Sequence, residues 1–436
     1  MASTYLTKVA PAAGNRTKGT ISMWVKRGSL GSTEYLYTEY LNSTDHGVVY
    51  FSGANGLNIV SVNGNSAEMQ LSTNRVFRDI NAWYHLVFAW DTSQGTAADR
   101  VKMYVNGVQE TSFSTATYPS QSSNLKFGIG SPGGNNYNIY IGRKGSASDY
   151  FTGSMSHFHR VDNQQLTPST FGSTDSTTGE WKINTSPSVT YGTNGFFILK
   201  DGNSVTDQSG NSNNFTVGGG TLTKTEDCPS NVFATLNPLA LNNNTSQNYG
   251  DFSEGNLKFV GNSATNNANG YSTIGFTKGK WYMETKIVGT QSHYPNLGIV
   301  PLRTFQRLNS QSGQVGSDSD SFAYKADGNK ENNGSSSYGD SFTTNDIIGI
   351  AVDLDNGAIY FSKNGTWQNS GDPTSGASKT GAAFGFTVLD EEYFFGFAVY
   401  QSSSGIECNF GNGYFGTTAV SSAGTNASGI GIFEYD

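Results

Sequence analysis

The chain has few of the charged residues that long helices and nucleic-acid surfaces require. Charged residues make up 14% of its 436 residues, and the net charge is −8. Solvated helices need Glu, Lys and Arg on their outer faces, so this shortage argues against a helical fold. The sequence contains no basic cluster that could neutralise a run of phosphates. We therefore expect no nucleic-acid partner.

Long apolar runs and paired cysteines are also missing. No stretch approaches the ~18 apolar residues of a membrane span, and residues 1–19 lack the apolar centre of a secretory signal. We expect a protein made in the cytoplasm without a cleaved signal and without a membrane partner. Cys228 and Cys408 belong to no C-x-x-C pair, so no zinc site is expected. Two free thiols are the simpler interpretation, and a disulfide is the alternative.

Glycine and aromatic residues are abundant instead. The chain has 54 glycines, and 13% of its residues are aromatic. Glycine and asparagine supply turns, whereas tyrosine, phenylalanine and the β-branched residues favour strands. Residues 83–90 (WYHLVFAW) are expected to form a buried strand, and one helical turn is expected at 166–171. Asn-Gly pairs at 106–107, 356–357 and 364–365 predict tight hairpin turns.

This pattern predicts an all-β protein with two tandem antiparallel β-sandwich domains. Strands separated by Gly/Asn turns are typical of sandwiches and barrels. We expect a first domain at 1–229, a linker at 230–255 and a second domain at 256–436. A polar stretch at 309–340 reads as a long loop within the second domain.

The first ~220 residues resemble a laminin G-like, concanavalin A-like jelly roll. The motifs are 19–27 (GTISMWVKR), 83–88 (WYHLVF), 101–107 (VKMYVNG), 139–143 (IYIGR), 151–155 (FTGSM) and 207–211 (DQSGN). Residues 271–415 resemble a SPRY domain through 279–284 (GKWYME), 297–299 (LGI), 346–365, 395–398 (FGFA) and 408–411 (CNFG). This tandem, joined by 229–239 (PSNVFATLNPL), is similar to virion appendage proteins of marine bacteriophages.

The sequence offers little for catalysis. Some jelly rolls are glucanases, which need two carboxylates flanking the bond to be cleaved. The best pair is Asp353 and Asp355, but turn formation explains Asp355. His157 and His159 share a strand face without a visible third metal ligand, and a polar strand face is the simpler interpretation. We therefore expect no enzymatic activity and no catalytic residues.

Calcium is the only cofactor that the resemblance makes plausible. Jelly rolls of this kind can bind the ion through loop carboxylates and carbonyls. The loops at 91–99 and 201–207 are the candidates, although neither has the regular ligand spacing of a dedicated calcium loop. The alternative is that their aspartates form turns, and the ligands of any metal stay unknown.

Four aromatic residues are the candidate ligand-binding residues. Tyr294, Tyr324 and Tyr338 lie in or beside polar loops of the second domain, and Trp367 follows an Asn-Gly turn. Exposed rings can stack on sugars, so these residues predict a binding rim. The alternative is that the rings fasten their own loops. Four other tryptophans are expected in the core because they lie in strand motifs: Trp24, Trp83, Trp90 and Trp281.

The resemblance implies a phage virion protein, of tail-fibre or capsid-fibre type, that attaches to host-surface carbohydrate. Its partners would be other virion proteins, and it would be present as a homo-oligomer or in many copies. A purely architectural capsid-decoration or tail-spacer protein is the main alternative. A polysaccharide-degrading enzyme is a third class, against which the missing carboxylate pair argues.

Overall fold

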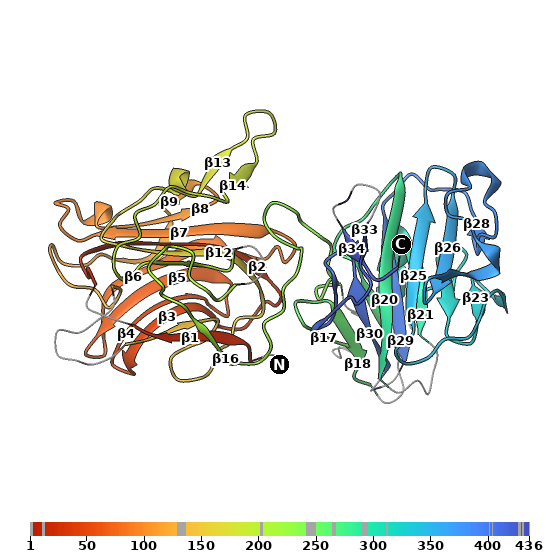
Figure 1. The fold of residues 1–436 in the computed structure, drawn as a ribbon, viewed down its shortest axis with the longest axis horizontal. Helices are drawn as coiled ribbons and strands as arrows, with labels where there is room; N and C mark the ends of the chain where they lie inside the picture. The colour runs from red at the N-terminus through yellow and green to blue at the C-terminus, as the bar shows by residue number, and fades with distance from the viewer. Residues whose placement is uncertain are drawn as a thin grey trace. The chain divides into compact units, whose positions relative to one another are not determined.

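The computed structural model describes most of the chain. The described residues are 3–10, 14–128, 137–200, 204–240, 250–263, 267–289, 295–310, 313–400, 402, 404–425, 429 and 431–435. They form two compact units, each an all-β sandwich (Figure 1). Unit 1 comprises Met1–Lys224 and Cys228–Ser230, and unit 2 comprises Thr225–Asp227 and Asn231–Asp436.

Unit 1 contains two large antiparallel sheets. The eight-stranded sheet has the order β10 (Phe113–Thr117), β6 (Ser66–Val76), β5 (Gly56–Asn63), β4 (Asp45–Phe51), β3 (Glu34–Asn42), β11 (Asn138–Ile141), β1 (Tyr5–Val9) and β16 (Thr216–Gly219). The six-stranded sheet has the order β15 (Phe196–Ile198), β12 (Gly153–Asp162), β2 (Lys18–Arg27), β7 (Trp83–Asp91), β8 (Val101–Val105) and β9 (Val108–Glu110). A separate hairpin joins β13 (Gly172–Thr174) to β14 (Trp181–Ile183), and short 3-10 turns lie at η1 (Ala97–Asp99) and η2 (Pro168–Thr170).

The core of unit 1 lies between its two sheets. Alternate strand residues point inward, as the period of two requires. The buried cluster includes Met23, Ile59, Phe88, Trp90 and Phe158. The inward face also holds a buried ion pair, in which Arg27 Nη2 lies 3.0 Å from Glu34 Oε2.

Unit 2 repeats this architecture with different strands. Its larger sheet has the order β17 (Gly250–Ser253), β18 (Lys258–Gly261), β30 (Ser404–Asn409), β20 (Lys280–Gly289), β25 (Ile347–Asp353), β26 (Ala358–Lys363) and β27 (Thr366–Trp367), and β28 (Phe384–Gly385) also pairs with β26. The six-stranded sheet has the order β19 (Asn267–Tyr271), β29 (Tyr393–Tyr400), β21 (Asn296–Pro301), β22 (Phe322–Lys325), β23 (Asn329–Glu331) and β24 (Ser335–Ser337). The described part of the unit also contains one helix, α1 (Leu302–Ser310), and the 3-10 turns η3 (Gln368–Ser370) and η4 (Gly376–Ser378). Two hairpins complete it: β31 (Tyr414–Phe415) with β32 (Thr418–Ala419), and β33 (Gly424–Thr425) with β34 (Ile432–Phe433).

The structure confirms the predicted all-β class and most of the predicted turns. Residues 83–90 lie in β7, and the turn at 168–170 is present. The pairs Asn106-Gly107 and Asn364-Gly365 both have positive φ, as tight hairpins require. The β25–β26 connection is different, because residues 354–357 form a wider turn in which only Gly357 has positive φ.

Two expected connecting segments carry regular structure. The described part of the predicted linker at 230–255 belongs to unit 2 from Asn231 onward, where it contributes β17 and the fully buried Leu236. The predicted loop at 309–340 contains β22, β23 and β24. β23 (NKE) and β24 (SSS) contain no aromatic or β-branched residue, so their pairing depends on β22, which itself pairs with β21, rather than on local propensity. Within the described ranges, no helix is long and apolar enough to span a membrane.

Candidate functional site

The aromatic residues predicted to form a rim on unit 2 are mostly packed into it. Tyr324 is fully buried on β22, and its ring lies 5.1 Å from that of Phe342. Its hydroxyl donates to the backbone oxygen of Asp340. The expectation that Tyr324 is an exposed binding ring is therefore wrong, because inward strand positions of β22 face the core.

Tyr338 and Trp367 are half-buried, and Tyr294 lies outside the described residues. Tyr338 packs edge-on against Tyr324, with ring centroids 5.4 Å apart, and burial raises its pKa to about 12. It therefore fastens the segment that precedes β25 to the core, which was the alternative interpretation. Trp367 lies beside Tyr282, with ring centroids 6.3 Å apart, on the outer face of the larger sheet.

The remaining sequence candidates have structural partners. Asp353 accepts from both the backbone and the side-chain nitrogen of Asn356 and lies 3.2 Å from Lys280 Nζ. Asp355 accepts from the backbone of Gly279. Both carboxylates thus hold the start of β20 and the β25–β26 turn, as turn chemistry predicts.

The two histidines of β12 are buried among aromatic rings. His159 is bonded to the Tyr191 hydroxyl at 2.8 Å and stacks 4.0 Å from Phe197. Burial, followed by the proximity of His157, holds the pKa of His159 well below its usual value. His157 has a φ of +46° at a β-bulge, so the simple alternation expected for these two residues breaks there.

Asp91 and Asp207, one from each candidate calcium loop, are engaged within the protein. Asp91 accepts from Ser93 and lies 2.8 Å from Lys18 Nζ. Asp207 accepts four hydrogen bonds, from Phe197, Ser209 and Asn213. Residues 201–203 lie outside the described part of the chain. Across the described part, no group of three His, Cys, Asp or Glu side chains is placed to hold a metal ion. Cys228 and Cys408 are free thiols there, as the simpler interpretation predicted.

The outer face of the eight-stranded sheet in unit 1 brings together aromatic and amide side chains that sequence reasoning missed. We call this surface the tyrosine face. Strand pairing arranges its side chains in three rows across the sheet. The first row is Tyr35, Tyr50, Asn58 and Ser72; the second is Thr7, Tyr140, Thr38, Val48, Val60, Gln70 and Thr117; the third is Val9, Asn138, Tyr40, His46, Val62 and Ala67.

The rows point away from the core because their strand neighbours point into it. Val49, Leu57, Ile59 and Leu71 alternate with members of the rows and belong to the buried cluster of unit 1. Adjacent strands are ~4.8 Å apart, so a row of four strands is about 14 Å long. The result is a broad surface in which rings, aliphatic groups and amides lie at regular spacing.

The rings of the tyrosine face are held in fixed positions. Tyr35 and Tyr50 stack with their centroids 4.9 Å apart. The Arg143 guanidinium lies 3.9 Å from the ring centroid of Tyr140 and 4.1 Å from that of Tyr5. Burial, followed by the proximity of Tyr50 and Asp149, raises the pKa of Tyr35 to about 12. Fixed rings lose little conformational entropy when a ligand binds.

Hydrogen-bonding groups remain available beside these rings. The Tyr50 hydroxyl and the amide oxygens of Asn58 and Gln70 make no hydrogen bond within the described part of the chain. Tyr50, Gln70 and Ser72 are half-buried, so each presents part of its surface to solvent, whereas Asn58 is 6% exposed. A half-exposed ring next to unoccupied donors and acceptors suits a ligand that has both an apolar face and hydroxyl groups.

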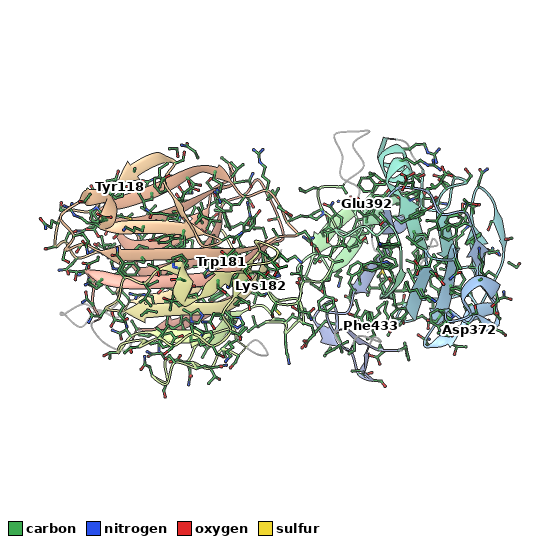
Figure 2. The ribbon with its side chains drawn as sticks, turned by 90° about the horizontal axis from the view of Figure 1, so that it is seen from above. Tyr118, Trp181, Lys182, Asp372, Glu392 and Phe433 are labelled. Carbon is green, nitrogen blue, oxygen red and sulfur yellow. The ribbon has the colours of Figure 1, made fainter. Side chains whose placement is uncertain are left out.

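The other sheet of unit 1 does not offer a comparable surface. Its outer face is covered by the segment that carries the β13–β14 hairpin, where Phe171 and Tyr191 pack on Val87 and Phe197. Trp181 of β14 stacks over His85 and donates from Nε1 to its Nδ1 at 2.9 Å. In Figure 2, Trp181 lies over the strands of this sheet.

Three of the four tryptophans that the sequence assigned to the core are buried. Trp24, Trp83 and Trp90 are buried as predicted. Trp281 is 40% exposed, so its assignment to the core is wrong. It is the second residue of β20, where its ring stacks on Phe276 with centroids 5.1 Å apart and covers the end of the sandwich.

Comparison with known proteins agrees with the two-domain architecture. The model of the concanavalin A-like lectin/glucanases superfamily matches residues 3–172, and the SPRY domain model matches residues 280–413. The ATP-dependent RNA helicase DDX1 of Xenopus laevis is 37% identical over 95 residues, which cover 22% of this chain and 12% of the helicase. The chain therefore spans about an eighth of that relative's length.

Several solved structures are similar to part of the chain. The SPRY domain of human HERC1 is 21% identical, with 35% of this chain and 87% of that chain covered and a TM-score of 0.28. A human SPRY domain is 18% identical, with 37% and 94% covered and a TM-score of 0.29. Stonustoxin is 19% identical, with 40% and 27% covered and a TM-score of 0.29. The two matched family models show that the chain carries a concanavalin A-like domain followed by a SPRY domain.

Proposed function

We propose that the chain is a non-enzymatic structural protein of a bacteriophage particle that attaches to host-surface glycans through the tyrosine face. The observation that carries the glycan assignment is the row of Tyr35, Tyr50, Asn58 and Ser72 across four strands. The virion assignment is supported by the tandem of domain types and by the motifs in each half. Other virion proteins would anchor the chain on the particle.

The chemistry of this face supports the proposed sugar recognition. A pyranose has an apolar face that packs on an aromatic ring, and its hydroxyls need donors and acceptors at the ring edge. Tyr50 supplies the ring, and the free amide oxygens of Asn58 and Gln70 supply acceptors. A single sheet row gives weak binding, but many copies on one particle can raise avidity by ~10²–10⁴.

The test is binding of the full chain to a panel of bacterial surface polysaccharides, with and without calcium, while released oligosaccharide is measured. Saturable binding without release is expected. Tyr50→Ala should weaken it about tenfold, which corresponds to ~1.4 kcal/mol. Tyr104→Ala is the matched control, because Tyr104 is half-buried on the outer face of the other sheet.

Other outcomes would point elsewhere. Oligosaccharide release would contradict the non-enzymatic part of the proposal. Loss of binding upon chelation would add calcium to the mechanism. The absence of binding to any polysaccharide would contradict glycan attachment and favour the architectural alternative, in which the chain contacts only other virion proteins.

A further inference from the structure

A small pocket opens at one end of the unit 2 sandwich, away from the residues that the sequence predicted as binding groups. It lies between the segment that precedes β22 and the segment that precedes β29. Its volume is about 230 Å³, and it is lined by Ser319, Asp320, Phe322, Phe386, Thr387, Leu389 and Tyr393. Sites for drug-sized ligands have ~300–1,000 Å³, so this pocket has room for about one small ring.

One wall of the pocket is aromatic and rigid. Phe322 and Phe386 stack with their centroids 4.5 Å apart and an interplanar angle of 27°. Tyr393 lies 6.0 Å from Phe386, and its position is fixed because β29 pairs with Phe276 through two backbone hydrogen bonds of 2.9 Å. A flat ligand with an apolar face can pack on this wall.

The Tyr393 hydroxyl is a donor without an acceptor. The residue is 1% exposed, and its oxygen accepts from the backbone nitrogen of Leu389 at 3.1 Å. No acceptor for the hydroxyl hydrogen is present among the described residues. An unused buried donor is unfavourable unless a ligand or water accepts from it. The pocket therefore places a hydrogen-bond donor beside the aromatic wall.

Asp320 supplies an acceptor on the same pocket. Its Oδ1 lies 3.1 Å from Arg303 Nη2, and Arg303 is also held by Glu391, with Nε and Oε1 3.4 Å apart. The second oxygen, Oδ2, makes no hydrogen bond or ion pair within the described residues. The fixed carboxylate thus keeps one oxygen for a ligand hydroxyl. The two carboxylates beside a single arginine also disfavour an anionic ligand.

We propose that this pocket binds a single neutral pyranose ring, such as the terminal sugar of a glycan. The ring would pack on Phe322 and Phe386, accept from the Tyr393 hydroxyl and donate to Asp320 Oδ2. The ligand class rests on the proposed glycan-attachment function, but the site is separate from the tyrosine face and lies in the other unit. The chain would then hold a polysaccharide at two kinds of site, one for an extended stretch and one for a chain end.

The test is saturation-transfer NMR of the full chain with D-glucose, D-galactose, L-rhamnose and N-acetyl-D-glucosamine at millimolar concentration. At least one sugar should bind, and Tyr393→Phe should weaken its binding about tenfold because it removes one buried hydrogen bond. Phe386→Ala removes one wall and should abolish the signal. Tyr338→Phe and Tyr104→Ala are the controls that leave the pocket intact, and both should bind the sugar as the unchanged chain does.

Three results would overturn the pocket proposal. The first is that none of the four sugars binds. The second is that a sugar binds equally well to Tyr393→Phe and to Phe386→Ala. The third is that N-acetyl-leucine amide binds in place of the sugars. The two proposals fail separately. A chain that binds a monosaccharide in the pocket but no polysaccharide contradicts the tyrosine face alone, whereas a chain that binds polysaccharide but no monosaccharide contradicts the pocket alone.

Discussion

Replacing Glu284 by glutamine should change how the stability of unit 2 depends on pH. Glu284 lies on β20 and is fully buried. Its two oxygens accept from the backbone nitrogens of Glu434 at 2.8 Å and Tyr435 at 2.7 Å. Asn409 and the Tyr282 hydroxyl lie at 3.2 Å. The carboxyl group therefore fastens the C-terminal segment to the larger sheet.

The magnitude follows from the pKa of this carboxyl group. Burial raises it from 4.5 to about 6, and the four hydrogen bonds oppose the rise. Because the folded-state pKa is the higher one, the contribution to stability is complete below pH 4.5 and is lost as the pH rises through 6. The loss amounts to about 2 kcal/mol. Glu284→Gln removes this titration and also replaces an oxygen that accepts two hydrogen bonds by an amide nitrogen that accepts none, at a cost of ~1–3 kcal/mol.

The assay is urea unfolding of the full chain and of Glu284→Gln at pH 4 and at pH 7, with the transition of unit 2 followed. All other titrating groups are common to both proteins, so they cancel in the difference. The destabilisation caused by Glu284→Gln should be about 2 kcal/mol smaller at pH 7 than at pH 4. A destabilisation that is equal at both pH values, or larger at pH 7, would refute this reasoning.

Three further predictions concern unit 1. Glu34→Gln should destabilise it by ~3–5 kcal/mol in urea unfolding, because Arg27 then stays buried without its 3.0 Å partner, and a loss below 1 kcal/mol would count against this. Burial lowers the pKa of the His85 imidazole to about 3, so NMR should show no titration of this ring between pH 8 and pH 5. The neutral ring contributes to stability above pH 6.5, and this contribution is lost as the pH falls. A titration midpoint near 6.5 would contradict the burial of His85. Gly107→Ala should loosen the β13–β14 hairpin, because the φ of Gly107 is +80° and the new Cβ would lie 2.5 Å from the Trp181 ring. Faster amide hydrogen exchange in β14 is expected, and unchanged exchange would argue against this prediction.

Local signals in the sequence predicted the fold class and several turns. Asn106-Gly107 forms a tight hairpin because its backbone conformation is decided by two neighbouring residues. The strand at 83–90 was predictable because every second residue is large and apolar. The predicted linker at 230–255 was placed outside the second domain because Leu236 is buried by residues distant in the sequence. The residues next to Leu236 in the sequence do not indicate such a contact.

The candidate sites depended on contacts that are distant in sequence, so the sequence predicted them poorly. Tyr324 was expected in or beside a polar loop and Trp281 in a core strand. Tyr324 is instead fully buried and Trp281 is 40% exposed, because the two residues lie at the middle and at the end of the sandwich. The tyrosine face requires the register of the seven strands that carry its rows. A bulge between Tyr35 and Tyr37 breaks the alternation there, so Tyr35 faces outward while Tyr37 joins the core.

The most direct test of the tyrosine face is a structure of the chain with an oligosaccharide cut from a polysaccharide that it binds. The predicted result is a pyranose ring against Tyr50, with its hydroxyls bonded to Asn58 and Gln70 and the glycan running across β3 to β6. An oligosaccharide bound elsewhere, with the tyrosine face unoccupied, would contradict the proposal that this face attaches the protein to glycans.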